Sequence, residues 1–434
     1  MRRMTNQGLE PVVLVEGCRT PFAKAFGPLA HLDSIDLGRR AVSELVLRSG
    51  IDPEIIDEVI FGSVVPCMRG PNLAREIVLG IGLPATIPGF TLNRACTSSL
   101  QSASIAVQMI ATGQADCVIA GGAESASNTP VPVRKELLKF LMGFQRKGAL
   151  GQLRQLLRFR PGHWVPAMPA LAEPSTGLTM GQHAEIMAQE AEVDRSSQDE
   201  LALRSHRRAA RATAEGHLSD EIAPIWVGKR FETCLASDPL VRADTSMAAL
   251  GRLRPVFDRK YGTITAGNAS PLTDGAAACL FLSQSKAKEL GLEAKAIIRS
   301  HVYRALDPAL GLLYGPAVST PPALERAGVS WSDIDLVEMH EAFAAQVLCN
   351  IRAFESDAFA QEKLGMKGSI GSVDWERFNV AGGSIAIGHP FAATGSRMLT
   401  TASNALRRQG GRYALVTACA AGAMGGTFVL ENPN

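Results

Sequence analysis

The sequence predicts an α/β protein made of two similar halves, with a long helical insertion in the first half. Strand-like and helix-like segments alternate near both ends of the 434-residue chain, a rhythm typical of a sheet covered by helices. Residues 45–64 and 323–343 share one pattern: a helix, a glycine stop, a spacer, an Ile-Asp pair and a strand. Residues 127–262 are helical and irregular, with few strand-like runs. A chance likeness between two alanine-rich units is the alternative to a duplication.

The elements of the first half follow from the spacing of apolar residues. The run PVVLVEG is short and apolar, as in a buried strand, whereas Leu37, Ala41 and Leu45 have the spacing of one helix face, and Gly50 ends that helix. In chain order we expect a strand at 11–17, a helix at 36–50, a strand at 56–64, a helix at 98–112, a strand at 116–125 and, after a turn, a buried strand in 270–291.

The second half repeats this order. Residues 392–422 parallel the segment that runs from Cys96 through its predicted helix to the next strand. We therefore predict an N-terminal α/β half, an inserted loop domain, a segment that completes the N-terminal half, and a C-terminal α/β half. Their boundaries are 1–126, 127–262, 263–291 and 292–434.

Composition excludes several classes of protein. The net charge of +2 gives no general attraction to nucleic acid. The eight cysteines form no CxxC pair and no cluster with histidines at zinc-site intervals, so we expect no structural metal and reduced thiols in the cytoplasm. We find no secretory signal, no apolar run long enough to span a membrane and no C-terminal peroxisomal or retention signal.

Cys96 is the first candidate for chemistry. It lies in the stretch NRACTSSLQSASIAV, at the start of a predicted apolar helix. Unpaired N–H groups and the helix dipole stabilise an anion there, so we expect a lowered pKa for the Cys96 thiol and a role as nucleophile. A small, buried structural cysteine is the alternative for the same pattern.

Three further motifs carry groups that can move protons or hold a ligand. His389 lies in the Gly-rich stretch GGSIAIGHPFAATGS, where an imidazole can take a proton from a thiol or donate to an oxyanion. His340 and Glu341 lie in VEMHEAFAA, at a strand end, where α/β sheets usually hold ligands. Cys419 follows an apolar strand in VTACAAGAMGG and could shuttle protons. Each motif taken singly also fits a structural role.

Together, these four motifs occur in the order and at the intervals of the thiolase family, and the chain resembles that family from RTPF (19–22) to FVLEN (428–432). The block TAGNASPLTDGAAA is similar to the thiolase strand behind the coenzyme A site. The HEAF and ACAAG forms resemble thiolases of the fatty-acid β-oxidation trifunctional complexes. The resemblance implies a thiolase fold with five layers, αβαβα. It also implies cleavage of a 3-ketoacyl-CoA by CoA to acetyl-CoA and a shorter acyl-CoA, with CoA as co-substrate and no metal or redox cofactor.

The resemblance also implies roles for single residues. Cys96 would attack the C3 carbonyl, and His389 would activate Cys96 and help hold the thioester oxygen of the departing enolate. Cys419 would protonate that enolate and then deprotonate the incoming CoA. His340 would complete one oxyanion site, and the backbone N–H groups of Cys96 and Ala421 would form the other.

The chain departs from the commoner thiolase pattern at one turn. Many thiolases have glycine at the positions that match Ala421 and Ala423. An alanine would be strained there if the turn requires a positive φ.

Contacts with substrate are also implied by the resemblance. Arg242 in LVRAD and Ser270 in NASP are candidate contacts to CoA, and Met180 and Phe343 would line the acyl or pantetheine path. A solvated surface charge is the alternative for Arg242.

Residues 131–164 form a basic segment with its own pattern. Residues 131–160 contain eight Lys or Arg residues and only one acidic residue, Glu136. Leu, Phe and Met residues are interleaved with the basic ones. This predicts a basic amphipathic helical hairpin, broken near Gly148 and Gly151. It could contact an anionic membrane, dock a hydratase/dehydrogenase α subunit, or cover the active-site mouth and attract the CoA phosphates. We favour contact with a partner or a membrane.

We therefore expect a degradative 3-ketoacyl-CoA thiolase that acts on acyl-CoA and CoA and forms a dimer or tetramer, as family members do. A biosynthetic acetoacetyl-CoA thiolase is the alternative within the fold. A catalytically silent lipid-binding or scaffold subunit is the alternative from another class.

Overall fold

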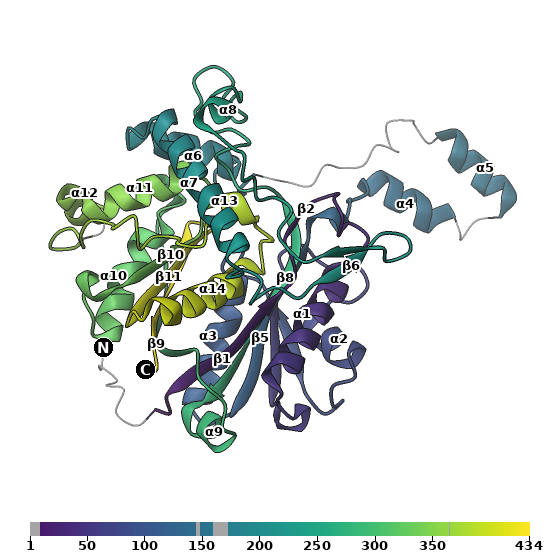
Figure 1. Cartoon of the computed structure of the whole chain (residues 1–434). Coiled ribbons are helices and arrows are strands. Elements are labelled where there is room, and N and C mark those ends of the chain that lie inside the picture. The colour runs from purple at the N-terminus through teal and green to yellow at the C-terminus, as the bar shows by residue number, and fades with distance from the viewer. Residues whose placement is uncertain (1–8, 145–147, 159–171, 364) are drawn as a thin grey trace.

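The strands of both halves join in one mixed ten-stranded sheet in this computed structural model, which describes residues 9–144, 148–158, 172–363 and 365–434. The sheet order is β10-β11-β12-β9-β1-β8-β5-β3-β4, and β2 pairs with β8 (Figure 1). The strands of this sheet are β1 (Val12–Arg19), β2 (Ala23–Lys24), β3 (Glu58–Gly62), β4 (Gly89–Leu92), β5 (Cys117–Ser125), β8 (Thr273–Ser283), β9 (Ala296–Ala305), β10 (Leu336–Met339), β11 (Tyr413–Ala420) and β12 (Met424–Glu431).

The pairing pattern confirms the predicted duplication. In the N-terminal half, β3 is parallel to β5, β5 is antiparallel to β8, and β8 is antiparallel to β1. In the C-terminal half, β10, β11, β12 and β9 repeat these relations in the same order. The two sets meet at a short ladder between β1 and β9, where Val13 pairs with Ile297 and Leu14 with Ala296.

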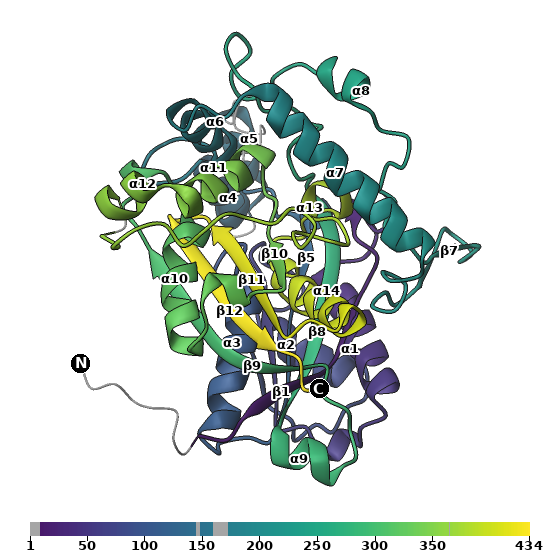
Figure 2. The same ribbon diagram turned by 60° about the vertical axis from the view of Figure 1, so that its left-hand side comes forward.

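The helices form layers around these two strand sets, as the resemblance leads us to expect. Helix α14 packs against strands of both halves and against α3, which packs against the N-terminal strands, so the two helices form the middle layer. Figure 2 shows α14 beside β11 and β8. Helices α1 and α2 cover the outer face of the N-terminal strands, and α10 covers β9 and β12. The bounds of these helices are α1 (Ser34–Ser49), α2 (Leu73–Gly80), α3 (Ser98–Ala111), α10 (Gly315–Ala327) and α14 (Thr394–Gln409).

Strand β1 shows how the sequence specifies the layers. Its side chains alternate between two faces. Val13 and Val15 belong to the core cluster with α1, whereas Val12 and Leu14 belong to the cluster with α3 and α14. Both faces are buried, which explains why PVVLVEG is continuously apolar rather than alternating.

A glycine allows the close approach of the two central helices. A Cβ added at Gly395, in the first turn of α14, would lie 2.6 Å from Leu100 Cγ and 2.7 Å from the Leu100 backbone nitrogen on α3. The N-terminal ends of α3 and α14 therefore meet, and the loops that precede these helices carry Cys96 and His389.

The remaining elements lie mainly between β5 and β8 and after β10. Most of the first group are helices, with one short antiparallel pair, β6 with β7. Their bounds are α4 (Lys135–Phe144), α5 (Ala149–Arg158), α6 (Met180–Glu190), α7 (Arg195–Ala214), β6 (Ile225–Val227), β7 (Thr233–Leu235), α8 (Met247–Gly251), α9 (Gln284–Glu289), α11 (Ala344–Glu355), α12 (Asp357–Glu362) and α13 (Ser384–Ile387).

Two predictions of local structure need correction. Gly151 lies inside α5 and does not break it, because a single glycine costs a helix only about 1 kcal/mol. The segment 270–291 holds more than a strand, since β8 ends at Ser283 and this serine caps the short helix α9 by accepting from the Lys286 N–H. Residues 145–147 and 159–164 of the predicted hairpin lie outside the described residues.

None of the described helices is long and apolar enough to cross a membrane. Helices α4 and α5 project beyond the body of the protein at the right of Figure 1.

Candidate active site

Three of the four predicted catalytic residues converge on one small volume. The Cys96 Sγ, one ring nitrogen of His340 and one ring nitrogen of His389 lie within 4.8 Å of one another. The two imidazole rings lie next to each other, with their centroids 4.1 Å apart and their planes inclined by 45°. Such donors also suit a metal ion such as Zn²⁺, so the expectation that no metal is needed stays a prediction.

Cys419 joins this cluster from the end of β11. Burial, with a smaller effect of the charge of Cys96, raises the pKa of the Cys419 thiol. The backbone of Ala421 hydrogen bonds to the Cys96 thiol. The His340 backbone N–H donates to the Thr417 carbonyl, which ties His340 to the same strand (2.9 Å). Strands β10 and β11 are parallel neighbours, so their carboxyl ends lie at the same edge of the sheet. His340 and Cys419 therefore lie at that edge, where α/β proteins usually bind ligands.

The backbone before Cys96 is strained. Ala95 has a φ of +46°, in the left-handed region that favours glycine, and costs about 1 kcal/mol or more. The Ala95 N–H donates to Asn93 Oδ1 (2.9 Å), and the Ser98 hydroxyl donates to the Ala95 carbonyl (2.7 Å). These bonds hold a sharp turn that places Cys96 just before the first turn of α3.

The expected lowering of the Cys96 pKa is wrong for this structure. Burial raises the pKa of the Cys96 thiol to about 11, although backbone hydrogen bonds of Ala421 and of Cys96 itself act in the opposite direction. The penalty for burying an anion therefore exceeds the stabilisation from the helix end. Cys96 is a neutral thiol at pH 7 and needs a base before it can attack.

His389 has the geometry of that base. Its Nδ1 lies 2.7 Å from Thr394 Oγ1, and the Thr394 hydroxyl donates its single hydrogen to the Pro390 carbonyl (3.1 Å). The Thr394 oxygen must therefore accept from His389 Nδ1–H, which leaves a lone pair on Nε2. That Nε2 is buried and has no hydrogen-bond partner among the described residues. Burial, with a smaller effect of Arg397, lowers the pKa of His389 to about 3, so the ring is neutral.

His340 is also neutral and buried. Burial, reinforced by His389 and Arg397, holds its pKa well below the usual value. Its Nδ1 lies 2.8 Å from Ser384 Oγ, and its Nε2 has no partner in the described part of the chain. Each of the two histidines therefore has one anchored and one unpaired nitrogen.

Glu341 holds the surrounding loops and does not face the thiol. It accepts from Ser205 Oγ (2.7 Å), Asn379 Nδ2 (2.7 Å) and the Ile385 N–H (3.2 Å). A Cβ added at Gly383 would lie 2.2 Å from its carboxyl carbon, so this Gly-rich loop must pass directly over it. Glu341 therefore orients neighbouring segments through these contacts.

Of the two alanines in the turn after Cys419, Ala421 and Ala423, only Ala423 has a strained backbone. Ala423 has a φ of +55°, whereas Ala421 is not in the left-handed region. The Ala421 N–H therefore hydrogen bonds to the Cys96 thiol without backbone strain at Ala421 itself. The Gly422 N–H donates to Glu173 Oε1 (2.9 Å), which anchors the turn to the inserted segment.

Of the residues predicted to contact substrate, Ser270, Phe343 and Met180 lie against the HEAF segment or its neighbouring core, whereas Arg242 lies at the surface. The Ser270 N–H donates to the Ala342 carbonyl (2.9 Å), so Ser270 lies beside the HEAF segment. Phe343 makes an edge contact with Phe257, with the ring centroids 5.9 Å apart. Met180 and these two aromatic residues pack against one hydrophobic core cluster. Arg242 is exposed, and its backbone N–H donates to His206 Nδ1 (3.2 Å). Their contacts with CoA stay predictions.

Sequence reasoning missed the residues that anchor the two histidines. Thr394 and Ser384 lie within five residues of His389, inside the motif already singled out. Glu338 lies two residues before His340 and pairs with the buried Arg397. An arginine between Ser396 and Met398, at a predicted buried helix start, was the one signal that could have indicated a buried ion pair.

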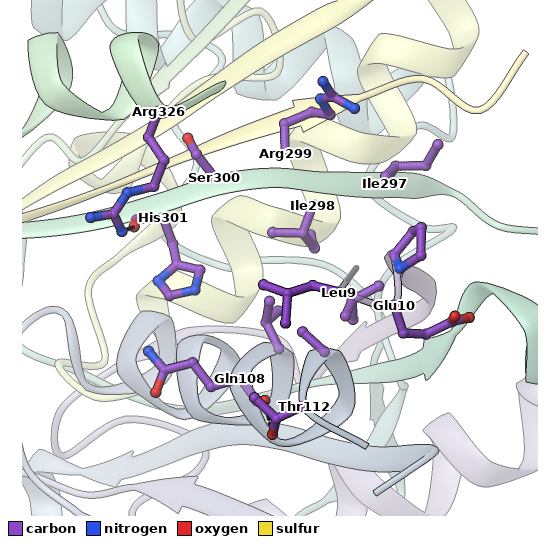
Figure 3. Close-up of a pocket in the computed structure, with 14 residues that line it drawn as sticks. Leu9, Glu10, Gln108, Thr112, Ile297, Ile298, Arg299, Ser300, His301 and Arg326 are labelled. Carbon is purple, nitrogen blue, oxygen red and sulfur yellow. Dashed lines mark hydrogen bonds between the residues drawn. The ribbon is translucent and has the colours of Figure 1, made fainter. Parts of the chain in front are cut away.

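The described part of the chain also contains a cavity away from this cluster (Figure 3). It has a volume of about 300 Å³ and lies between α3, β9 and the segment before β1. Its lining includes Gln108, Arg299, His301 and Arg326, and none of the predicted catalytic residues.

Comparison with known proteins identifies the class of this fold and site. The model of the thiolase N-terminal domain matches residues 12–285, and that of the thiolase C-terminal domain matches residues 292–432. The chain belongs to the thiolase family. It is 46% identical over 429 residues to a 3-ketoacyl-CoA thiolase of Yersinia enterocolitica serotype O:8, an alignment that covers 99% of this chain and 98% of the relative.

Solved structures give the same result. The crystal structure of human mitochondrial 3-ketoacyl-CoA thiolase matches with a TM-score of 0.84 and 32% identity, over 98% of this chain and 100% of that chain. The human enzyme in complex with CoA matches with a TM-score of 0.83 and 32% identity, over 98% of each chain. The predicted family and fold are confirmed.

Proposed function

We propose that this chain is a degradative 3-ketoacyl-CoA thiolase, an acetyl-CoA C-acyltransferase of fatty-acid β-oxidation. It would cleave a 3-ketoacyl-CoA with CoA to give acetyl-CoA and an acyl-CoA two carbons shorter. The observation that carries the proposal is the placement of the Cys96 thiol within 4.8 Å of two buried, neutral imidazoles. Its similarity over 99% of its length to an enzyme named 3-ketoacyl-CoA thiolase supports the same substrate class.

In the first half-reaction, the Cys96 thiol passes its proton to His389 Nε2 and the sulfur attacks C3 of the substrate. Burial disfavours a single charge on either group, but this transfer creates two opposite charges side by side, which attract each other. The oxygen at C3 becomes an oxyanion near His340. Collapse of this intermediate breaks the C2–C3 bond, forms the acyl-Cys96 thioester and releases the enolate of acetyl-CoA, which takes a proton from Cys419.

In the second half-reaction, the Cys419 thiolate takes the proton from the thiol of an incoming CoA. The CoA sulfur attacks the acyl-Cys96 thioester, and the N–H groups of Cys96 and Ala421 would stabilise the oxyanion. Cys96 leaves as a thiolate and recovers its proton from the His389 imidazolium. Burial and the charge of Cys96 raise the pKa of Cys419, so this residue starts each cycle protonated and able to act as an acid.

Turnover of purified protein tests this proposal. We expect loss of the 3-ketoacyl-CoA enolate absorbance when CoA is added, with ping-pong kinetics because an acyl-enzyme forms. Activity is expected to survive dialysis against EDTA, since no step uses a metal. Turnover of acetoacetyl-CoA but of no longer 3-ketoacyl-CoA would favour the biosynthetic alternative. No turnover of any 3-ketoacyl-CoA with a chain of C4 to C16 would favour a scaffold subunit.

We further propose that the protein is cytoplasmic and forms a homodimer or homotetramer, and that it can bind a hydratase/dehydrogenase α subunit. All eight cysteines are free, which agrees with a reducing compartment. Sedimentation of the protein, alone and mixed with a candidate α subunit, tests both assembly states.

We also propose that α4 and α5 form a contact surface for an anionic membrane or a partner. Leu137 and Phe140 are buried, but other apolar side chains point outward beside basic ones. The exposed apolar residues are Leu138, Leu141, Met142, Leu150, Leu153 and Leu156. Basic residues on the same two helices include Lys135, Lys139 and Arg154. This combination is typical of a helix that lies on a charged membrane surface.

Replacing Leu138, Leu141 and Met142 together with serine is expected to weaken flotation with vesicles that contain phosphatidylserine, because the three exposed side chains supply apolar area. Thiolysis should be unchanged. Leu47→Ser is the matched control, since Leu47 is exposed on α1. Deletion of residues 134–160 that alters neither flotation nor the size of a complex with the α subunit would contradict the proposal.

A further inference from the structure

The two buried histidines are held by different partners, and this difference determines which nitrogen of each ring carries the hydrogen. Thr394 accepts from His389 Nδ1–H, because its own hydrogen goes to the Pro390 carbonyl. Ser384, the hydrogen-bond partner of His340, has the opposite role, because it is free to donate its hydrogen to the ring. Its oxygen already accepts from Arg397 Nη2 (3.2 Å).

The Ser384 hydroxyl must place its hydrogen on His340. No other acceptor for this hydroxyl occurs among the residues that the structure describes, and His340 Nδ1 lies 2.8 Å from it. If the hydroxyl donates there, Nδ1 is an acceptor and the ring hydrogen is on Nε2. His340 then presents an N–H to the pocket, whereas His389 presents a lone pair. The pocket beside Cys96 therefore has one N–H donor for an oxyanion, on His340, and one acceptor for a thiol proton, on His389.

Arg397 is placed to enforce this arrangement. Its side chain is fully buried in the first turn of α14, three residues after Thr394. It pairs with the buried Glu338 on β10. A cation is unfavourable at a helix N-terminus. Arg397 Nε and the second Glu338 oxygen also lack partners within the described residues. Buried pairs with unmet groups seldom stabilise a fold, so packing alone does not explain this one.

The first turn of α14 thus holds both imidazoles. Thr394 contacts His389 directly, and Arg397 reaches His340 through Ser384. The positive charge of Arg397 also disfavours protonation of both rings, in addition to burial.

We propose that Ser384, oriented by the buried Arg397–Glu338 pair, is a positioning residue that fixes His340 with its hydrogen on Nε2, so that His340 donates to the substrate oxyanion while His389 accepts the Cys96 proton. The inference rests on the proposed thiolase function for its catalytic meaning. The tautomer itself is a property of the free protein.

Nitrogen-15 NMR of histidine-labelled protein tests the tautomer without turnover. Signals are assigned by their loss in His340→Gln and His389→Gln. We expect hydrogen on Nε2 of His340 and on Nδ1 of His389 in the wild type. In Ser384→Ala, His340 should lose its single tautomer while His389 keeps its own. Hydrogen on Nδ1 of His340 in the wild type, or an unchanged His340 in Ser384→Ala, would overturn the proposal. Absence of thiolysis in the wild type would overturn only the function.

Kinetics separate positioning from loose packing. Ser384→Ala is expected to lower kcat about 10- to 100-fold with little change in KM, because a donor to the transition state becomes disordered. The rate of Cys96 alkylation by iodoacetamide should stay within about twofold, since the Cys96–His389 pair is untouched. Ser384→Thr, which keeps the hydroxyl, should recover most of the activity.

Ser396→Ala is the matched control. Ser396 is a buried serine next to Arg397 whose hydroxyl has no hydrogen-bond partner in the described chain. It should retain wild-type kinetics. Equal effects of Ser384→Ala and Ser396→Ala on kcat, or parallel losses of kcat and alkylation rate in Ser384→Ala, would show that the serine has only a structural role.

Discussion

Replacing Cys96 with alanine is expected to lower kcat for thiolysis by about 10⁴-fold or more, because the acyl chain then has no covalent carrier. The variant should fold normally, since a sulfur that faces the pocket contributes little to the core. Mass spectrometry after mixing with a 3-ketoacyl-CoA should show an acyl adduct on the wild type and none on Cys96→Ala.

Cys234→Ala is the control for this experiment. Cys234 is an exposed free cysteine on β7 and has no role in the proposed mechanism, so its replacement should leave both the adduct and kcat unchanged. An acyl adduct that persists in Cys96→Ala would assign the nucleophile to another side chain and would contradict the mechanism.

Replacing His389 with glutamine should cause the second large loss, together with a change in pH dependence. The wild-type pair has its pKa values at about 3 for His389 and about 11 for Cys96, so neither group titrates between about pH 5 and 9. The amount of the neutral Cys96–His389 pair is therefore constant in that range. Because His389 takes the thiol proton in this mechanism, we expect a nearly flat rate of Cys96 alkylation. Without the base, only thiol that has ionised by itself can react, and at pH 7 this is about one molecule in 10⁴ for a pKa near 11.

The thiolate fraction of His389→Gln rises about tenfold for each pH unit below the thiol pKa, so its alkylation rate should rise with the same slope from pH 6 to 9. We expect kcat at pH 7 to fall about 10³-fold or more. Iodoacetamide kinetics, read by mass spectrometry of the Cys96 peptide, measure this slope. A flat profile in His389→Gln would show that another group removes the proton.

The pKa of the Cys96 thiol shows why neighbouring residues alone do not determine protonation. A cysteine at a helix start predicts a lowered pKa from the helix dipole. That field is a property of a few neighbouring residues and can be read from NRACTSS. The opposing cost of burial depends on α14, β11 and the His340 loop, which are hundreds of residues away in the chain. The cost of burial is larger, so the sequence predicted Cys96 as the candidate nucleophile but not the protonation state of its thiol.

The hairpin illustrates the same limit on a smaller scale. Charge and apolar spacing predicted two amphipathic helices, which α4 and α5 are. Gly151 was misjudged because propensity at one residue is weak beside the pattern of the whole helix.

By itself, the sequence determined the alternation of strands and helices, the repeat of one unit in the two halves, and the residue types that make up the reactive cluster. These features are encoded in local spacing and in short motifs. Only the tertiary structure decided the protonation of Cys96 and the hydrogen position on each imidazole, because both depend on desolvation and on hydrogen bonds between segments far apart in the chain. Ser384, Arg397 and Glu338 became visible as one connected group only when α14 and β10 were brought together.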